Sequence, residues 1–390
     1  MRDDSRIFGL DLLRAAAILT VVYGHGESLV GMVLPYYGLF AFEGVTLFFV
    51  LSGFLVGGIF MRMVDSAGSG FADLVSFWSR RWMRTLPAYF FVLALLGLAA
   101  LIRDGALPAG FASYVFFAQN LAWAHPDFFP EAWSLAVEEW FYLVVPLAMA
   151  MTAWLGRMSP RKAVLLWIVL IILGVTLFRL YRVQAVGLED LDLWDASLRK
   201  QVLTRLDSIM FGVLGAWFAH WHPQLWRRGS QMLCLSGLYL LLADQLAYRN
   251  PAYREYLHLT VCPAGALLLL PWLSAMRVPA VAGVPPAVLA TLAGGIRFVS
   301  RISYSMYLVH VSVVLFLLMP LLSGYTGTGP PGALLRYACY WVLSLGLAWL
   351  LYRYVEQPFL RMRDRWGRAN GPVPAGAAAV PDRGAALSKD

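Results

Sequence analysis

The sequence has little charge for its length. Only 14% of its 390 residues are Asp, Glu, Lys or Arg, whereas soluble domains average roughly 25%. Hydrophobic residues make up 60% of the chain, and the mean hydropathy is +0.65. This composition excludes an ordinary soluble domain. It predicts an all-α fold, a polytopic bundle of transmembrane helices.

Cysteine is also scarce. Cys234, Cys262 and Cys339 are odd in number and form no CxxC pair, which excludes a disulfide framework or a zinc site. We therefore expect no metal. The net charge of +8 comes from arginines between apolar segments, the usual pattern of cytoplasmic loops. This charge is explained by contact with membrane lipids, and we expect no nucleic acid as a partner.

Apolar windows of about 20 residues predict ten spans. Shorter apolar stretches at 108–124 and 280–296 contain Pro and Gly and are expected to be interfacial or re-entrant, which allows eleven. The predicted spans are 7–26, 38–61, 85–102, 133–154, 163–181, 204–221, 230–247, 257–276, 301–322 and 333–354.

Lys and Arg placement sets the expected orientation. Alternate connecting segments are rich in arginine, while 27–37 and 323–335 contain none. Both termini are therefore predicted to be cytoplasmic, in a multi-pass protein of the cell membrane. The first segment lacks a cleavage site and is expected to stay as an anchor. We divide the chain into a transmembrane domain, 1–362, and a disordered cytoplasmic tail, 363–390, which is rich in Ala, Gly and Pro.

Two ionisable residues, Arg14 and His25, lie inside the first apolar segment. Such groups are costly in a bilayer and usually have a partner or a function. At ~100° per residue their spacing returns within ~20° of the same helix face, ~16 Å apart along the axis. One helix thus directs a cation and an imidazole into the interior. The alternative is that Arg14 pairs with Asp11 and His25 lies at the interface.

Acids from other spans fall at the depth of His25. Glu43, Glu138, Glu139 and Asp207 all lie toward the predicted outer ends of their spans. This convergence predicts a polar, water-accessible outer cavity. The alternative is a set of unrelated charges that each reach the interface alone.

The segment RRWMRTLPAY precedes the predicted third span. Arg80 and Arg84 are an i,i+4 pair, and Arg81 and Arg84 are i,i+3, so these residues share a helix face. Guanidinium groups bind phosphate oxygens in pairs. The cluster suits a phosphorylated cofactor that enters from the cytoplasm. Anchoring to lipid headgroups is the alternative.

The last two spans also carry polar residues. Tyr307 and His310 are one turn apart in ISYSMYLVH, where a hydrogen-bonded packing role is the alternative to a functional one. Near the end of the tenth span Glu356 is expected to pair with Arg353, and Pro358 to end the helix.

These segments, in this order, resemble the integral-membrane acyltransferase family 3, over about residues 6 to 361. The matching segments are LDLLRAAAILTVVYGH, GVTLFFVLSGFLVGG, FWSRRWMRTLPAYF, AWSLAVEEWFYLVVPL, RLDSIMFGVLGAW, ISYSMYLVH and YRYVEQPF. The resemblance implies O-acylation, usually O-acetylation, in which cytoplasmic acyl-CoA (acetyl-CoA) supplies the acyl group. The acceptor would be a hydroxyl of an extracytoplasmic or lipid-linked glycan, as in the modification of cell-envelope polysaccharides.

The resemblance also implies site residues. An arginine followed after ten residues by a histidine is the family hallmark, here Arg14 and His25. The arginines expected near the CoA phosphates are Arg80, Arg81 and Arg84, and the fourth-span glutamates are Glu138 and Glu139. Two positions depart from the family pattern, Leu12 for Gly and Thr46 for an acid, and Glu43 is expected to replace that acid. No segment resembles an SGNH-type hydrolase domain, so we expect the membrane domain or a partner to act on the acceptor.

A mechanism follows from both lines of reasoning. His25, whose unperturbed pKa is near ~6.5, is the expected base toward the acceptor hydroxyl, and Glu138 or Glu139 would orient its ring. Arg14 would hold the pantetheine arm or polarise the thioester oxygen; an acyl-histidine intermediate is a variant. The residues expected on the acceptor side are Glu43, Asp207, Tyr307 and His310.

Two other functions stay open. Intramembrane charges also mark the substrate paths of transporters and flippases, although that class predicts repeats or paired broken spans, which the sequence does not show. Within the acyltransferases, the acceptor could instead be a small molecule such as a macrolide or a peptide.

Overall fold

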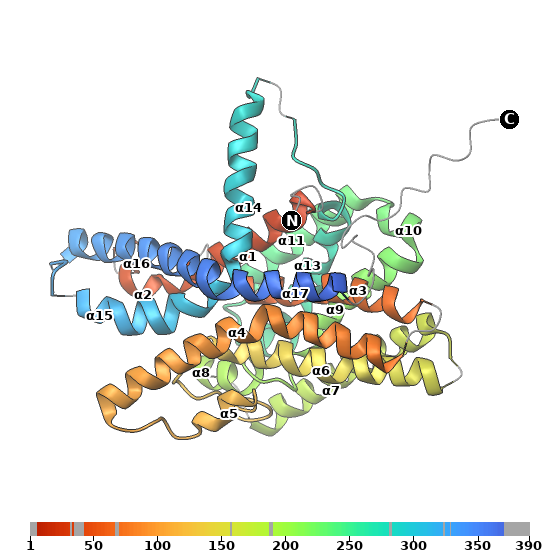
Figure 1. Ribbon diagram of the computed structural model, residues 1–390, viewed down its shortest axis with the longest axis horizontal. Helices are drawn as coiled ribbons and strands as arrows, with labels where there is room; N and C mark the ends of the chain where they lie inside the picture. The colour runs from red at the N-terminus through yellow and green to blue at the C-terminus, as the bar shows by residue number, and fades with distance from the viewer. Residues whose placement is uncertain are drawn as a thin grey trace.

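The computed structural model describes residues 6–31, 33–34, 43–66, 70–156, 158–186, 190–280, 283–322, 324–327 and 329–369. Within these ranges the regular structure is helical throughout, without strands (Figure 1). The all-α prediction is confirmed. Residues 370–390 of the predicted tail lie outside the described ranges.

The long helices are α1 Phe8–His25, α3 Gly44–Val64, α4 Phe71–Asp104, α6 Ala132–Leu155, α7 Pro160–Val186, α9 Leu206–Trp221, α11 Ser230–Ala247, α13 Leu259–Leu273, α14 Pro286–Val309, α16 Gly329–Leu351 and α17 Gln357–Ala369. Short helices are α2 Glu27–Val30, α5 Phe111–Val115, α8 Leu191–Trp194, α10 Pro223–Arg227, α12 Pro251–Tyr253 and α15 Met319–Leu322. Four segments are π-helical, η3 Asp195–Arg199, η4 Arg254–His258, η5 His310–Leu318 and η6 Tyr352–Glu356.

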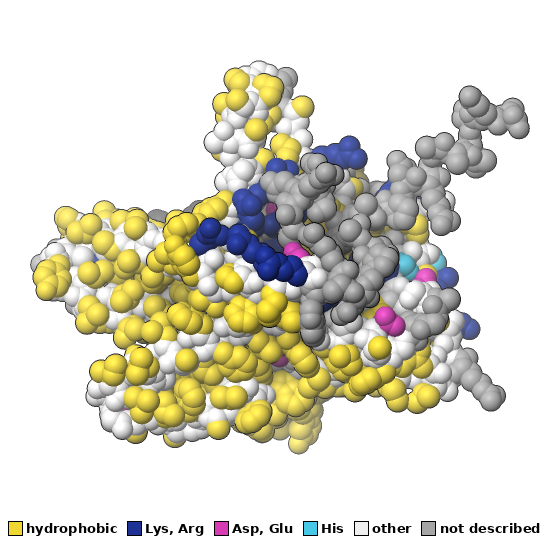
Figure 2. Space-filling view, in the orientation of Figure 1, with side chains coloured by type: hydrophobic (Ala, Val, Ile, Leu, Met, Phe, Trp, Pro, Cys, Tyr) yellow, Lys and Arg dark blue, Asp and Glu magenta, His cyan; other side chains and the backbone are white. Residues whose placement is uncertain are grey.

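Among the described residues, eight helices are long and apolar enough to cross a membrane. They correspond to eight of the ten predicted spans. The other two predicted spans form α9 and α11, which have 16 and 18 residues. Apolar side chains cover much of the surface in Figure 2, and many leucines on α7 and α11 are exposed. Such a surface suits contact with lipid, as expected of a polytopic membrane protein.

Two sequence-based boundaries differ from the structure. Helix α4 begins at Phe71, before the predicted start of the third span at 85, so the arginines predicted to share a helix face lie within this helix. The stretch predicted to be re-entrant, 280–296, enters α14 at Pro286, and this helix continues through η5. Pro in the first turn starts a helix, because the N–H that it lacks would have no helical partner there. The first half of α14 projects from the bundle (Figure 1).

The end of the tenth span also differs from the prediction. Pro358 lies in the first turn of α17 and does not stop the helical course, which continues to Ala369. The predicted pairing of Glu356 with Arg353 is wrong. Glu356 is buried and accepts a hydrogen bond from Ser305 at 2.9 Å, whereas Arg353 donates to the side chain of Gln357.

Helices α3 and α9 cross at two glycines. A Cβ atom on Gly53 would lie 2.0 Å from the carbonyl oxygen of Ile209, and one on Gly212 would lie 2.0 Å from that of Val50. Only residues without a side chain allow this approach, a common solution in membrane helix pairs. The contact fixes the rotation of α3, whose Ser52 then faces the cavity described next.

Candidate active site

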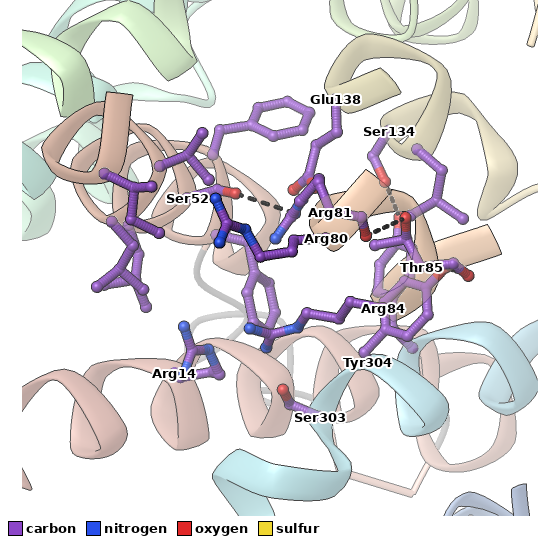
Figure 3. A pocket seen from close by; sticks show the side chains of 18 of the residues that line it. Arg14, Ser52, Arg80, Arg81, Arg84, Thr85, Ser134, Glu138, Ser303 and Tyr304 are labelled. Carbon is purple, nitrogen blue, oxygen red and sulfur yellow. Dashed lines mark hydrogen bonds and ion pairs between the residues drawn. The ribbon is translucent and has the colours of Figure 1, made fainter. Parts of the chain in front are cut away.

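A cavity of about 250 Å³ lies between α1, α3, α4, α6, α14 and α17. Figure 3 shows arginine side chains from α1 and α4 directed into it. The described residues that line it include one acid, Glu138, and five arginines, Arg14, Arg80, Arg81, Arg84 and Arg363. The first four arginines were predicted from the sequence; Arg363 was not.

Helix α4 supplies three of these arginines from one face. Because Arg80 and Arg84 are four residues apart in an unbroken helix, both reach the cavity, as their spacing predicted. Arg81 forms an ion pair with Glu138 of α6 at 2.9 Å and also contacts Tyr142. Arg80 and Arg84 form no hydrogen bond or ion pair with any residue that the structure describes.

Arg14 is also poorly neutralised. Its guanidinium lies 3.9 Å from the carboxylate of Asp11, which is already bonded to Arg6 and accepts from Ser300 at 2.7 Å. Asp11 therefore gives Arg14 only a distant partner. Like charges brought together away from water repel strongly. The arginine end of the cavity is thus suited to an anion with several negative groups.

The rest of the cavity is mostly apolar. Phe48, Ser52, Leu55 and Ile59 of α3 line it at helical spacing. Its wall on the side of α6 and α14 includes Ser134 and Tyr307, whose hydroxyl groups lie 2.7 Å apart. The cavity thus combines an arginine-rich part, an apolar surface of α3 and two hydroxyl groups.

Two histidines contact each other behind this wall. The His310 ring centroid is 5.6 Å from that of Tyr307 and 5.0 Å from that of His25. His310 is fully buried, whereas His25, the last residue of α1, is exposed. Neither histidine lines the cavity itself. The sequence did not predict this pair, because its members are 285 positions apart.

Hydrogen bonds define the tautomers of the neutral histidines. Nδ1 of His310 lies 2.7 Å from the carbonyl oxygen of Tyr307, which only accepts, so Nδ1 carries the proton. Nε2 of His310 is then an acceptor, and it lies 3.2 Å from Nδ1 of His25. Nδ1 of His25 also lies 3.0 Å from the carbonyl oxygen of Val21. Two acceptors around that nitrogen place its proton there and leave Nε2 of His25 with a free lone pair.

The glutamates of α6 do not contact His25. Glu138 belongs to the arginine cavity through Arg81, and Glu139 is buried and accepts from Thr85 at 2.9 Å. The expectation that one of them orients the His25 ring is therefore not what the structure shows. His310 occupies that position instead.

Glu43 and Asp207, expected on the acceptor side, are engaged in ion pairs. Both carboxylate oxygens of Glu43 accept from Arg199 at 3.2 Å. Burial alone would raise the pKa of Glu43, but the charges of Arg199 and Arg205 outweigh burial and hold it below its usual range. Asp207 has no exposed surface and pairs with Arg179 at 2.7 Å. The prediction that Asp207 borders an open cavity is thus not supported by its surroundings.

Comparisons with known proteins agree with this architecture. The family model described as "Acyltransferase domain" matches residues 7–353. Fold and site together define a helical membrane protein with an arginine-lined cavity. The chain belongs to the integral-membrane acyltransferase family 3 and carries its acyltransferase domain.

Curated relatives share part of this region. "Putative O-acetyltransferase SACOL0978" of Staphylococcus aureus (strain COL) is 30% identical over 187 residues, which cover 44% of this chain and 29% of the relative. "O-acetyltransferase OatA" of the same strain is 30% identical over 177 residues, or 40% of this chain and 26% of the relative. The match thus spans less than a third of the relatives' length. No solved structure matches the chain.

Proposed function

We propose that this protein is a membrane O-acyltransferase that moves an acetyl group from acetyl-CoA to a hydroxyl of an extracytoplasmic or lipid-linked glycan. The observation that carries the proposal is the arginine-lined cavity, which ends at the Ser134–Tyr307 wall with the histidine pair behind it. The names of the relatives support O-acetylation. The arginine end would bind the donor, and the histidine end would bind the acceptor.

The arginines would hold the donor. Arg80, Arg81, Arg84 and Arg14 bind phosphate oxygens, which are bidentate partners for guanidinium groups. The apolar wall of α3 takes the pantetheine arm, and the acyl group lies toward Tyr307. Glu138 holds Arg81 in place, and the burial of Glu139 gives it a structural role between α6 and α4.

The histidines would activate the acceptor. Nε2 of His25 takes the proton of the acceptor hydroxyl as its oxygen attacks the thioester carbonyl. The carbon–sulfur bond then breaks, and the proton passes to the departing CoA sulfur. In the free protein the hydroxyls of Ser134 and Tyr307 bond to each other and to the carbonyl oxygen of Glu131. Once the acceptor displaces Tyr307, the hydroxyl of Ser134 would be free to donate to the thioester carbonyl oxygen as that oxygen gains charge. His310 holds the proton of His25 on Nδ1, and its earlier assignment to substrate binding stays a prediction.

The two substrates would arrive from opposite sides of the cell membrane. The arginine-rich end faces the cytoplasm together with both termini, in line with the positive-inside pattern. His25, exposed at the other end of α1, faces the outside and the glycan. Glu43 and Arg199 lie on this side, and Glu43 would accept hydrogen bonds from sugar hydroxyls.

The experiment is an acetyl-transfer assay with purified protein in lipid nanodiscs. Radiolabelled acetyl-CoA is incubated with candidate glycans, and label in the glycan is measured. We expect transfer by the wild type and its loss, by about 10²-fold or more, in His25→Ala. A folded His25→Ala variant that keeps half of wild-type turnover would contradict the role of His25. Absence of labelled product with every glycan, while CoA binds, would contradict the acceptor class.

A further inference from the structure

The cavity holds an arginine that comes from outside the predicted transmembrane domain. Arg363 belongs to α17, which packs along α4, and it lines the cavity together with Arg80 and Arg84. Its charge lies close enough to repel both of them. Basic side chains gather on this face around α17 in Figure 2. The last described helix thus adds a cation where cations already repel one another.

The net charge of the cavity indicates how much negative charge a ligand must carry to balance Arg363 and the other arginines. Among the lining residues that the structure describes, five arginines face one glutamate, a formal excess of four positive charges. Arg363 has its neighbour Asp364 as an ion-pair partner at 2.7 Å, and it remains 21% exposed. A ribose 3′-phosphate and a pyrophosphate diester together carry roughly four negative charges at neutral pH. The lining charges match those of CoA when Arg363 is counted, because its partner Asp364 lies outside the lining.

The order of the residues along the helices places Arg363 within the cavity. Arg80 precedes Arg81 on α4, while Ser134 lies one turn from Glu138, the partner of Arg81, on α6. Arg80 also lies one turn before Arg84 on α4, and we take Arg363, whose charge acts on both arginines, to lie at the end remote from the Ser134–Tyr307 wall. A thioester that reaches the wall leaves the ribose of CoA at this remote end.

We infer that Arg363 is a donor-binding residue of α17 that pairs with the ribose 3′-phosphate of CoA. This inference rests on the proposed function. It makes α17 a part of the binding site, beyond the transmembrane domain that ends at 362 in the sequence-based division. Arg14 and Arg84 then meet the pyrophosphate.

The test compares two ligands and three variants. Binding of CoA and of dephospho-CoA, which lacks the 3′-phosphate, is measured by calorimetry in nanodiscs of zwitterionic lipid. We expect Arg363→Gln to weaken CoA binding about tenfold, the size of a lost charge-assisted contact, and to leave dephospho-CoA binding unchanged. Arg84→Gln should weaken both ligands. Arg361→Gln is the matched control, because Arg361 is on the same helix and exposed, and it should change neither.

Results that overturn the role of Arg363 can be told apart from a result that overturns the proposed CoA donor. Unchanged CoA binding in Arg363→Gln, or an equal loss for both ligands, would overturn the assignment of Arg363 to the 3′-phosphate. An equal loss in Arg361→Gln and Arg363→Gln would indicate a general charge effect at the lipid surface and would overturn it as well. If the wild type binds neither ligand, the CoA donor of the proposed function fails, and that result is separate from any difference between variants.

Discussion

His310 shows how one buried residue can determine the chemistry of an exposed one. Its ring accepts from Nδ1 of His25 and is itself oriented by the carbonyl oxygen of Tyr307. Together with the carbonyl oxygen of Val21, this chain of bonds leaves the Nε2 lone pair of His25 free. The proposed function would make His310 a positioning residue, since it contacts His25 and does not line the cavity.

We predict that His310→Leu lowers kcat on the order of 10²-fold and leaves the KM for acetyl-CoA unchanged. Leucine fills similar space but cannot accept a hydrogen bond, so only the carbonyl oxygen of Val21 is left to hold the proton of His25 on Nδ1. His310→Gln, whose side-chain oxygen can accept, should retain a larger share of activity. Steady-state acetyl transfer gives both constants. A Leu variant as active as the Gln variant would show that only packing matters at this position.

At the scale of the helix, α4 supplies three of the five arginines in the cavity, where the proposed function places the donor. We predict that replacing Arg80 and Arg84 together with Gln weakens CoA binding by at least about tenfold and makes it less dependent on salt. Fewer exposed ionic contacts remain to be screened. Arg228→Gln is the control, because Arg228 is exposed on another segment. Calorimetry at two salt concentrations measures both effects, and an unchanged affinity would favour the alternative of lipid anchoring.

The crossing of α3 and α9 gives a prediction about stability. Gly53→Ala would place Cβ 2.0 Å from the Ile209 carbonyl oxygen, so the helices must separate, at a cost of about 1–3 kcal/mol or more. Gly58→Ala, on the same helix, meets only the end of Arg62 at 3.7 Å and should be neutral or slightly stabilising. Thermal unfolding in detergent compares the two. Equal Tm values would mean that the crossing is not close.

The sequence predicted what lies within one helix and not what lies between helices. The common face of Arg80 and Arg84 follows from helical spacing alone. The contact between His25 and His310 arises because distant helices pack together. No local pattern in the sequence predicts such a contact. Arg363 was assigned to the tail, which was defined by its Ala, Gly and Pro content, but it lies in α17, because Pro358 is accommodated in the first turn of this helix. The fold class was predictable because composition alone determines it.

At the scale of the whole molecule, the proposed function requires that the end of α1 at His25 and helix α17 lie on opposite sides of the membrane. We predict that Glu27→Cys, just beyond His25 and exposed, reacts with an impermeant maleimide outside intact cells. Arg361→Cys, exposed on α17, should react only after permeabilisation. Both are placed in a background without Cys234, Cys262 and Cys339. Labelling of both from the same side would contradict the proposed transmembrane arrangement.

The hydrogen bond between Ser134 and Tyr307 has a further consequence for selectivity against water. In the proposed function the thioester would lie in the cavity, whose walls are mostly apolar, on one side of this pair, while His25 lies on the other side. Water that reaches His25 from outside is therefore kept from the acyl group until the wall opens. An acceptor that displaces the Tyr307 side chain as it binds would open it. Transfer to the acceptor would then be favoured over hydrolysis of the thioester, because His25 and the acyl group come together only when the acceptor is bound.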